Sequence, residues 1–196
     1  METVWLWLYL IGFALFHSFL LHPPVLAWIR AQSPKLFSVH RLLYNKISSL
    51  ALLALPWLFP EQLKVVYQLS APWFWLAAGL SLFGACLIFW VIAVQFDLFH
   101  FLGYRHLAQP NLGPVSDQPL VTRGVFAWCR HPLYFGLILA LWSLPVQWRL
   151  TLHLAVFSSL YCFIGSFFEE ARLLDKFGDA YRNYQKSTPR LIPFLF

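Results

Sequence analysis

Two short clusters of ionisable residues lie beside apolar stretches of this sequence, and they are the side chains best suited to chemistry. The first is Arg130-His131-Pro132-Leu133-Tyr134, where a charged loop meets an apolar segment, and the second is the Glu169-Glu170 pair at the end of the next apolar segment. Ionisable groups near a bilayer are costly unless they have partners or a function. An imidazole, a guanidinium and two carboxylates in this arrangement therefore indicate a functional site.

The composition predicts an all-α, polytopic membrane protein that would position these clusters. The chain has 196 residues, of which 60% are hydrophobic and 11% charged, whereas a soluble domain has about 25% charged residues. A helix needs about 20 apolar residues to cross the hydrocarbon core. We expect about five transmembrane helices, within residues 4–21, 42–59, 71–96, 133–146 and 150–168. The fourth run is short, so it either begins upstream near Gly124 and spans, or forms a hairpin with the next helix.

The distribution of basic residues predicts the orientation of the chain. Only Lys64 and Arg149 fall on one side of the expected helices. The other basic residues lie in the first loop, the third loop and the tail, at Arg30, Lys35, Arg41, Lys46, Arg105, Arg123, Arg130, Arg172, Lys176, Arg182, Lys186 and Arg190. The positive-inside rule then places the N-terminus outside and the C-terminus in the cytoplasm, most simply of a bacterial cytoplasmic membrane. The net charge of +6 mostly reflects this asymmetry, and no nucleic-acid-binding patch is expected.

We expect a single membrane-embedded domain, 1–196, with a three-helix part at 1–96 and a loop, a helical hairpin and a cytoplasmic tail at 97–196. The loop at 97–129 is rich in glycine and proline, and a long irregular loop of this kind often closes over a ligand. In the tail, Leu173, Phe177 and Tyr181 share one face of a predicted amphipathic helix over 169–185. The tail is expected to pack against the loop and close the site from the cytoplasm.

Five segments carry a resemblance to a known family. They are, in order, LVTRGVF at 120–126, RHPLYFG at 130–136, EE at 169–170, FGDAY at 177–181 and PRLIP at 189–193. Together they resemble the isoprenylcysteine carboxyl methyltransferase superfamily, whose members are membrane-embedded enzymes that use S-adenosylmethionine. Residues 16–18 and 41–45, in the N-terminal half, are more similar to the NnrU and methanethiol methyltransferase branch, and residues 96–99 are similar to the methanethiol enzymes.

The resemblance implies S-adenosyl-L-methionine as the cofactor and assigns site residues. Glu169 matches the family's cofactor-contacting glutamate, and a carboxylate of Glu169 or Glu170 can neutralise the cofactor's ammonium. His131, with Arg130, is the expected catalytic group, since an amine or hydroxyl acceptor would need a base. The other expected cofactor-binding residues are Gln118, Leu120, Val121, Phe126, His131, Pro132 and Tyr134. Free backbone N–H groups at the helix start after His131 could hold the cofactor's carboxylate.

One departure from the family pattern concerns the methyl acceptor. Prenylcysteine methyltransferases have an arginine four residues before the glutamate that matches Glu169, and this chain has Gly165 there. A carboxylate acceptor would lose its counter-charge, and an unpaired anion in apolar surroundings costs several kcal/mol. We therefore expect a small or lipophilic acceptor that enters from the membrane, and a thiol fits this expectation best.

Several alternatives remain open at this point. The acceptor could be a prenylcysteine or a lipid, and the histidines His17, His22, His40, His100 and His106 could instead indicate an NnrU-like haem-binding or redox-linked protein. Arg130 and His131 could be interfacial anchors, and the Glu169-Glu170 pair a solvated helix end. Cys129 could be a nucleophile, although a thiol among apolar residues usually packs. No CxxC spacing occurs, so no metal site is expected.

Overall fold

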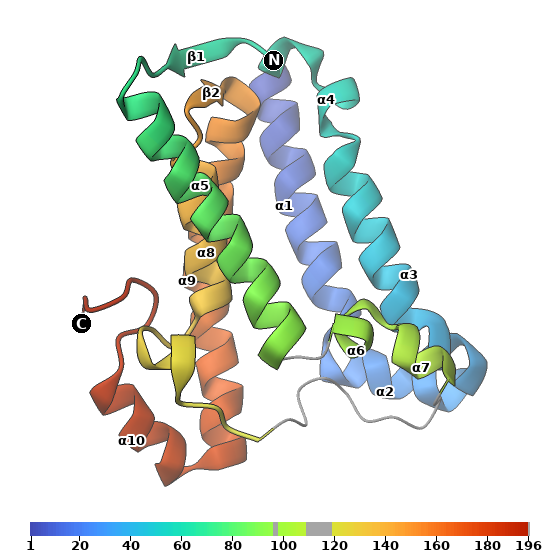
Figure 1. Ribbon diagram of the computed structural model, residues 1–196. Coiled ribbons are helices and arrows are strands. Elements are labelled where there is room, and N and C mark those ends of the chain that lie inside the picture. Colours follow the sequence, from blue (N-terminus) through green and yellow to red (C-terminus); the bar gives the residue numbers. More distant parts are fainter. Residues whose placement is uncertain (96–97, 109–118, 196) are drawn as a thin grey trace. The chain divides into compact units, whose positions relative to one another are not determined.

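The computed structural model describes residues 1–95, 98–108 and 119–195, and the chain there is mostly helical. It divides into two compact units. The first contains residues 1–63 together with 92–118, and the second contains 64–91 together with 119–196. Figure 1 shows the ribbon of both units. Both expected clusters of ionisable residues belong to the second unit.

The first unit is built on two long helices, α1 (Glu2–Leu20) and α3 (Pro34–Leu53). The unit also contains α2 (Pro23–Gln32), α4 (Leu55–Leu58), a 3-10 turn at Pro60–Gln62, α6 (Leu98–Leu102) and α7 (Tyr104–Ala108). A π-helical turn at Val91–Gln95 follows α5, and all of it but Val91 is assigned to this unit. The Tyr9 hydroxyl donates a hydrogen bond to the Ala51 carbonyl at 2.9 Å and ties α1 to α3. The Phe101 carbonyl accepts hydrogen bonds from Arg41 and Asn45, which fastens α6 to α3.

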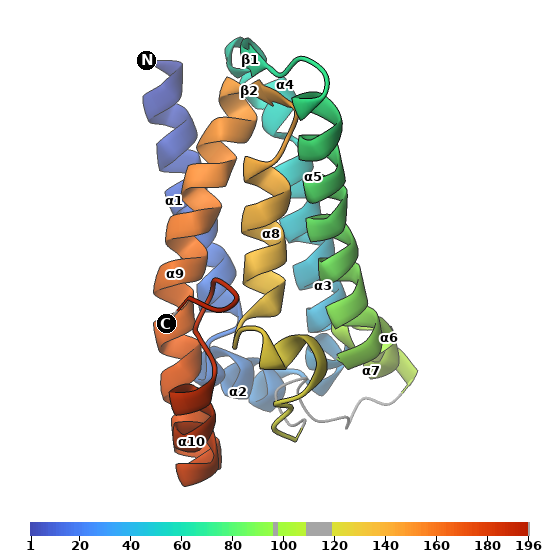
Figure 2. The same cartoon turned by 60° about the vertical axis from the view of Figure 1, so that its left-hand side comes forward.

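The second unit contains three apolar helices that lie side by side in both ribbon views (Figures 1 and 2). They are α5 (Trp73–Trp90), α8 (Pro132–Trp142) and α9 (Arg149–Phe177). A 3-10 turn at Gly124–Ala127 precedes α8, and α10 (Asp179–Ser187) follows α9. The short strands β1 (Val65–Gln68) and β2 (Val146–Trp148) pair antiparallel at the end of the unit opposite α10. This small sheet is an addition that the sequence did not indicate to a mostly helical fold, because pairing between two distant short segments leaves no periodic pattern in the sequence.

Glycines bring the backbones of α5 and α8 together. A Cβ added at Gly84 would lie 2.6 Å from the Gly136 carbonyl oxygen, and one added at Gly136 would lie 2.9 Å from the Gly84 carbonyl oxygen. The Ser81 hydroxyl donates a hydrogen bond to the Ala140 carbonyl at 2.8 Å. Small residues and interhelical hydrogen bonds are typical of helix contacts within membranes, where the surrounding lipid is as apolar as a leucine side chain. This contact fixes α8, the helix that His131 directly precedes.

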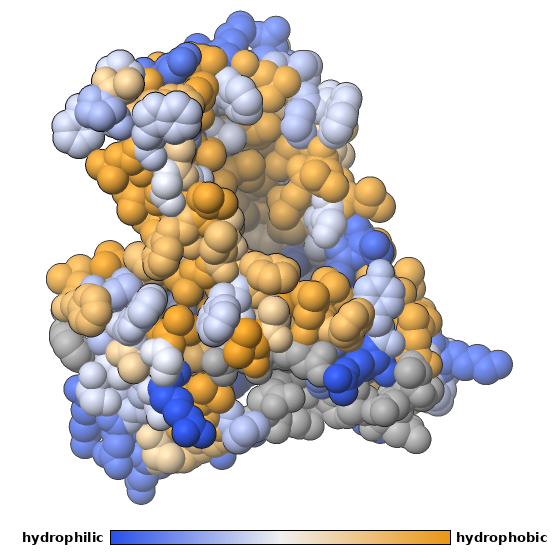
Figure 3. All heavy atoms as spheres, in the orientation of Figure 1, coloured by the Kyte–Doolittle hydropathy of each residue, from blue (hydrophilic) through white to orange (hydrophobic). Residues whose placement is uncertain are grey.

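Three helices of the described chain are long and apolar enough to cross a membrane: Glu2–Leu20, Trp73–Val94 and Arg149–Phe177. Figure 3 shows hydrophobic side chains along α5 and hydrophilic ones over α10. The fourth expected span does not begin near Gly124. The helix α8 begins at Pro132 and has 11 residues, which corresponds to about 17 Å and is shorter than the ~30 Å hydrocarbon core. It therefore forms the hairpin with α9 that was the other expectation.

The helix that carries the two glutamates is longer than the sequence pattern indicated. The expectation of one amphipathic helix over 169–185 is wrong in its continuity, because residues 169–177 are the end of α9 and a separate helix, α10, begins at Asp179. Gly178 then adopts a φ of 55°, a left-handed conformation that glycine tolerates best. The chain turns there and α10 begins, with Tyr181 and Tyr184 buried on its inner face. The break allows α10 to return toward the start of α8.

Candidate functional site

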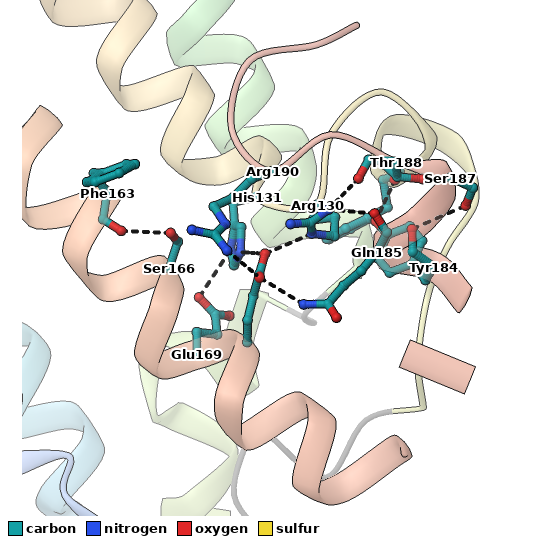
Figure 4. Close-up of polar contacts among 12 residues, drawn as sticks. Arg130, His131, Phe163, Ser166, Glu169, Tyr184, Gln185, Ser187, Thr188 and Arg190 are labelled. Carbon is teal, nitrogen blue, oxygen red and sulfur yellow. Dashed lines mark hydrogen bonds and ion pairs between the residues drawn. The ribbon is translucent and has the colours of Figure 1, made fainter. Parts of the chain in front are cut away.

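The C-terminal tail is attached by backbone hydrogen bonds to the residues that precede α8. The Arg130 amide donates to the Pro189 carbonyl at 2.9 Å, and the His131 amide donates to the Arg190 carbonyl at 3.1 Å. These two amides are therefore not free to bind a ligand carboxylate. The expected anion site at the start of α8 could use only the backbone N–H groups that follow Pro132. The attachment brings Gln185 and Arg190 of the tail beside Glu170, and Figure 4 shows the polar contacts between the tail and this part of α9.

The Glu170 carboxylate is the centre of a network of buried charges. Its side chain is 4% exposed, and its Oε1 lies 2.7 Å from Arg130 Nε and 3.2 Å from His131 Nε2. Its Oε2 accepts hydrogen bonds from Gln185 Nε2 at 2.9 Å and from Arg190 at 3.1 Å. A carboxylate has about four lone-pair positions, and these four contacts occupy them. Glu170 thus joins α9, the start of α8 and the tail.

The Arg130 guanidinium is used within the protein. Besides its contact with Glu170, it donates hydrogen bonds to the Gln185 carbonyl at 3.1 Å and to the Thr188 carbonyl. Its side chain is only 8% exposed. A buried guanidinium with these partners holds the tail in place, so the geometry supports a positioning role for Arg130 rather than direct contact with a reacting group.

Glu169 is in a different position from its neighbour. Its Oε2 lies 3.3 Å from His131 Nδ1, and its side chain is 37% exposed. The Tyr134 hydroxyl also makes a polar contact with this carboxylate. Glu169 therefore combines an oriented carboxylate with an open side, which is the arrangement that a cationic ligand group requires.

His131 bridges the two glutamates and is 5% exposed. Burial opposes its protonation, but hydrogen bonds and negative charge from Glu169 and Glu170 outweigh burial and raise the pKa of His131 above its usual value. The imidazole ring stacks in parallel on the Tyr134 ring, with centroids 5.2 Å apart. A protonated His131 stabilises both carboxylates and fixes their orientation.

The raised pKa of His131 predicts how stability depends on pH. A group whose pKa is higher in the folded state contributes stability below its unfolded pKa, about 6.5 for histidine, and loses it as pH rises through the folded value. We expect the free energy of unfolding of the natural protein in detergent, relative to that of His131→Gln, to be largest near pH 6 and to decrease toward pH 9. The exposed His22, replaced by glutamine, serves as the control. A difference that grows with pH would contradict the prediction.

Of the expected residues in the loop before α8, Phe126 contacts the tail. Leu120 and Val121 are half-buried, and Phe126 belongs to the 3-10 turn before α8. The Phe126 carbonyl accepts a hydrogen bond from the Tyr184 hydroxyl at 2.5 Å, so the tail packs on the described end of the loop. Pro132 is buried at the first position of α8. Gln118 lies outside the described residues.

For two residues of the network, the sequence analysis predicted no role in the site. Gln185 and Arg190 both contact Glu170, and the Arg190 guanidinium also lies 3.8 Å from the centroid of the Phe167 ring. Arg190 falls within the PRLIP segment, which is a signal that could have identified it. Nothing in the sequence pattern distinguishes Gln185 from other polar residues of α10.

The structure also concerns two alternative interpretations of the sequence, a nucleophilic Cys129 and a haem ligand at His17. Burial raises the pKa of the Cys129 thiol to about 11, so this thiol stays protonated near neutral pH and is a poor nucleophile. In the first unit, His17 contacts Ser48 at 3.0 Å through Nδ1 and Tyr44 through Nε2. Both ring nitrogens of His17 are therefore engaged, which leaves no nitrogen free for an axial haem bond. Within the described part of the chain, no group of three or more His, Cys, Asp or Glu side chains forms a metal site.

Comparison with known proteins identifies related sequences. Residues 77–174 match the isoprenylcysteine carboxyl methyltransferase (ICMT) family. The chain is 31% identical to methanethiol S-methyltransferase 2 of Bradyrhizobium diazoefficiens over 189 residues, which cover 94% of this chain and 70% of that protein. It is 32% identical to methanethiol S-methyltransferase of Pseudomonas deceptionensis, over 93% of this chain and 70% of that protein.

A second group of relatives aligns over a shorter stretch. The chain is 36% identical to protein-S-isoprenylcysteine O-methyltransferase of Tribolium castaneum over 97 residues, which cover 47% of this chain and 33% of that protein. No solved structure matches the chain. The similarity to the methanethiol enzymes thus extends across most of the chain, whereas the similarity to the prenylcysteine enzyme extends across about half.

Proposed function

Because the chain belongs to the isoprenylcysteine carboxyl methyltransferase family, it is a methyltransferase, and we propose that it transfers a methyl group from S-adenosylmethionine to a small thiol. The observation that carries this proposal is the contrast between the two adjacent glutamates. Glu170 is saturated by contacts within the protein, whereas Glu169 is oriented by His131 and is 37% exposed. The Glu170 carboxylate stabilises the site, and the Glu169 carboxylate is accessible to a ligand.

The residues around Glu169 suit a zwitterionic, cationic cofactor. S-adenosylmethionine supplies a methyl group on a positively charged sulfur, so the leaving group is already activated. Glu169 would pair with the cofactor's ammonium, and His131 would hold the carboxylate in position for that contact. Leu120, Val121 and Phe126 would cover the cofactor from the loop side. Catalysis then depends mainly on positioning, because the chain supplies a fixed geometry and an apolar surrounding.

The acceptor class follows from the charge around Gly165. The part of α9 from Leu150 to Phe168 contains no lysine or arginine that would pair with an acceptor carboxylate. The Arg190 guanidinium, which lies over the Phe167 ring, is already bound to Glu170. A thiol can enter as a neutral group and ionise beside the positive sulfur, and a thiolate needs no general base once formed. The names of the relatives that match most of this chain agree with a thiol acceptor.

We also propose that the protein is a multi-pass protein of the bacterial cytoplasmic membrane, with its N-terminus outside and its active site facing the cytoplasm. The apolar helices support membrane insertion, and the asymmetric basic residues support this orientation. Fusing a reporter that is active only in the cytoplasm to the C-terminus tests the orientation. Reporter activity of the C-terminal fusion agrees with the proposed orientation, whereas reporter activity of an N-terminal fusion would indicate the opposite orientation.

A substrate panel tests the proposed reaction. The protein, purified in detergent, is incubated with methyl-labelled S-adenosylmethionine and with methanethiol, longer alkanethiols, a lipid amine or a farnesylcysteine derivative. We expect label in the thioether products of the thiols and none above background in a methyl ester of farnesylcysteine. Ester formation with inert thiols would show that a carboxylate is the acceptor and that Gly165 has been misinterpreted.

A further inference from the structure

Arg41, in α3 of the first unit, carries a guanidinium that the protein holds without a counter-charge. Its Nε donates a hydrogen bond to the Phe101 carbonyl at 3.1 Å, and its guanidinium carbon lies 5.6 Å from the centre of the Tyr44 ring and 5.2 Å from that of the Phe101 ring. Within the described residues, no carboxylate forms an ion pair with Arg41. A partly buried charge without an opposite charge is costly, and in a membrane protein it indicates a binding site.

The two rings and the carbonyl fix the guanidinium but leave most of its donors unused. Arginine has five N–H donors in a planar fork, and the contact with Phe101 uses the one on Nε. The N–H groups on Nη1 and Nη2 have no acceptor in the part of the chain that the structure describes. Arg41 is half-buried, and neither Nη atom belongs to the unpaired polar atoms that the described chain shields from solvent. Both Nη atoms are therefore accessible, and such a fork matches two oxygens of a phosphate.

The position of Arg41 along α3 corresponds to the depth of lipid headgroups. The apolar run that is expected to cross the membrane begins directly after Arg41, at residue 42. The helix α2 lies across the same end of α1 and α3 (Figure 1), and its Trp28 is 63% exposed. Tryptophan favours the membrane–water interface, so Trp28 and Arg41 both mark this level. The phosphate available at this depth is that of a phospholipid.

The charges of this segment favour a headgroup with a net negative charge. Residues 3–60 contain no aspartate or glutamate, whereas Arg30 and Lys35 are exposed. The Arg30 guanidinium lies over the Phe37 ring at 5.3 Å, and Phe37 is one turn before Arg41 on the same face of α3. Clustered basic residues at a membrane surface attract anionic lipids, and they repel the ammonium of a zwitterionic headgroup.

We propose that Arg41 binds the phosphate of an anionic phospholipid through its two Nη atoms, while Tyr44 and Phe101 hold the guanidinium in place. Asn45 supports this arrangement, because its Nδ2 donates a hydrogen bond to the same Phe101 carbonyl at 2.9 Å. The lipid supplies the counter-charge that the described chain lacks, and it thereby stabilises the contact of α3 with α6. The site lies in the first unit and uses none of the residues proposed for methyl transfer.

Lipid binding to the detergent-purified protein, measured by native mass spectrometry, tests the site. We expect the natural protein to bind phosphatidylglycerol more tightly than phosphatidylcholine. Arg41→Gln should weaken the binding of phosphatidylglycerol about tenfold, because charge-assisted hydrogen bonds are lost. Lys46→Gln is the matched control, since it removes the same charge from an exposed position of α3 that is about 140° around the helix from Arg41. The control should bind phosphatidylglycerol as the natural protein does.

Thermal unfolding in detergent keeps the test decisive if Arg41→Gln is itself less stable. Phosphatidylglycerol should raise the unfolding temperature of the natural protein, and this increase should be lost in Arg41→Gln whatever its starting temperature. Arg41→Lys keeps the charge but not the planar fork, so it should retain only part of the increase. If Arg41→Gln does not fold, Arg41→Lys takes its place in the comparison with Lys46→Gln.

Three results would overturn the proposal. In the first, Arg41→Gln binds phosphatidylglycerol as tightly as the natural protein does. In the second, Lys46→Gln loses as much binding as Arg41→Gln, which would show a general effect of surface charge. In the third, inorganic phosphate displaces phosphatidylglycerol, which would show that the site takes a soluble anion. Equally tight binding of phosphatidylcholine that also depends on Arg41 would overturn the selectivity for anionic headgroups and retain the phosphate contact.

Discussion

Replacing Glu169 by alanine is expected to lower the affinity for S-adenosylmethionine by about a hundredfold while the protein still inserts into the membrane and purifies folded. Removing one partner of a charge-assisted hydrogen bond costs about 1.5 to 3 kcal/mol. The side chain is 37% exposed, so solvent screens the pair and the loss stays below the 3–5 kcal/mol of a fully buried pair. Isothermal titration calorimetry of the purified protein measures the change directly.

The matched control for Glu169→Ala lies on the same helix. Asp175→Ala removes an exposed carboxylate near the end of α9 and should leave cofactor affinity unchanged. Thermal unfolding of both variants in detergent checks that each remains folded. An unchanged affinity in Glu169→Ala would show that the cofactor's ammonium is bound elsewhere, and the assignment of Glu169 would be wrong.

Replacing the adjacent Glu170 by alanine is expected to give the opposite result, a loss of stability rather than a specific loss of binding. The side chain is 4% exposed and contacts Arg130, His131, Gln185 and Arg190. Removing it leaves the buried Arg130 guanidinium without its counter-charge, which costs about 3–5 kcal/mol. We expect a clear decrease in the unfolding temperature and release of the tail, detected as faster proteolysis after α9.

The tail also supplies the control for Glu170→Ala. Asp179 and Arg182 form an ion pair at 3.9 Å with both side chains largely exposed, and such surface pairs contribute little to stability. Asp179→Ala should therefore unfold at nearly the natural temperature. If Glu170→Ala were as stable as Asp179→Ala but lost cofactor binding, Glu170 and not Glu169 would be the cofactor's partner.

The two variants together distinguish the glutamate that stabilises the site, Glu170, from the glutamate expected to contact the ligand, Glu169. Glu170, Arg130 and the tail hold one another, and their contacts are complete within the protein. Glu169, His131 and Tyr134 share contacts with one another but leave one side of the carboxylate open. The tail contributes Gln185 and Arg190 to the first group, so a residue near the C-terminus stabilises the start of α8.

The sequence by itself determined the class of protein and pointed to the charged residues of the proposed site. Apolar runs and the low content of charged residues predict membrane helices. Insertion into lipid depends on how apolar a segment is, and this can be read from the segment alone. The segments at 130–136 and 169–170 identified the charged residues of the site before any contact was known. The departure at Gly165 indicated that an acceptor carboxylate would lack its counter-charge.

Only the tertiary structure decided which of these charged residues are free to act. Glu169 and Glu170 are adjacent and chemically identical, and the difference between them arises from Arg130, Gln185 and Arg190, which reach Glu170 from other elements. The continuation of α9 to Phe177, the turn at Gly178 and the pairing of β1 with β2 likewise depend on packing between distant segments. A sequence pattern reports which side chains are present, but the satisfaction of each polar group depends on non-local contacts, and those contacts separate the carboxylate that holds the fold from the one that is open to a ligand.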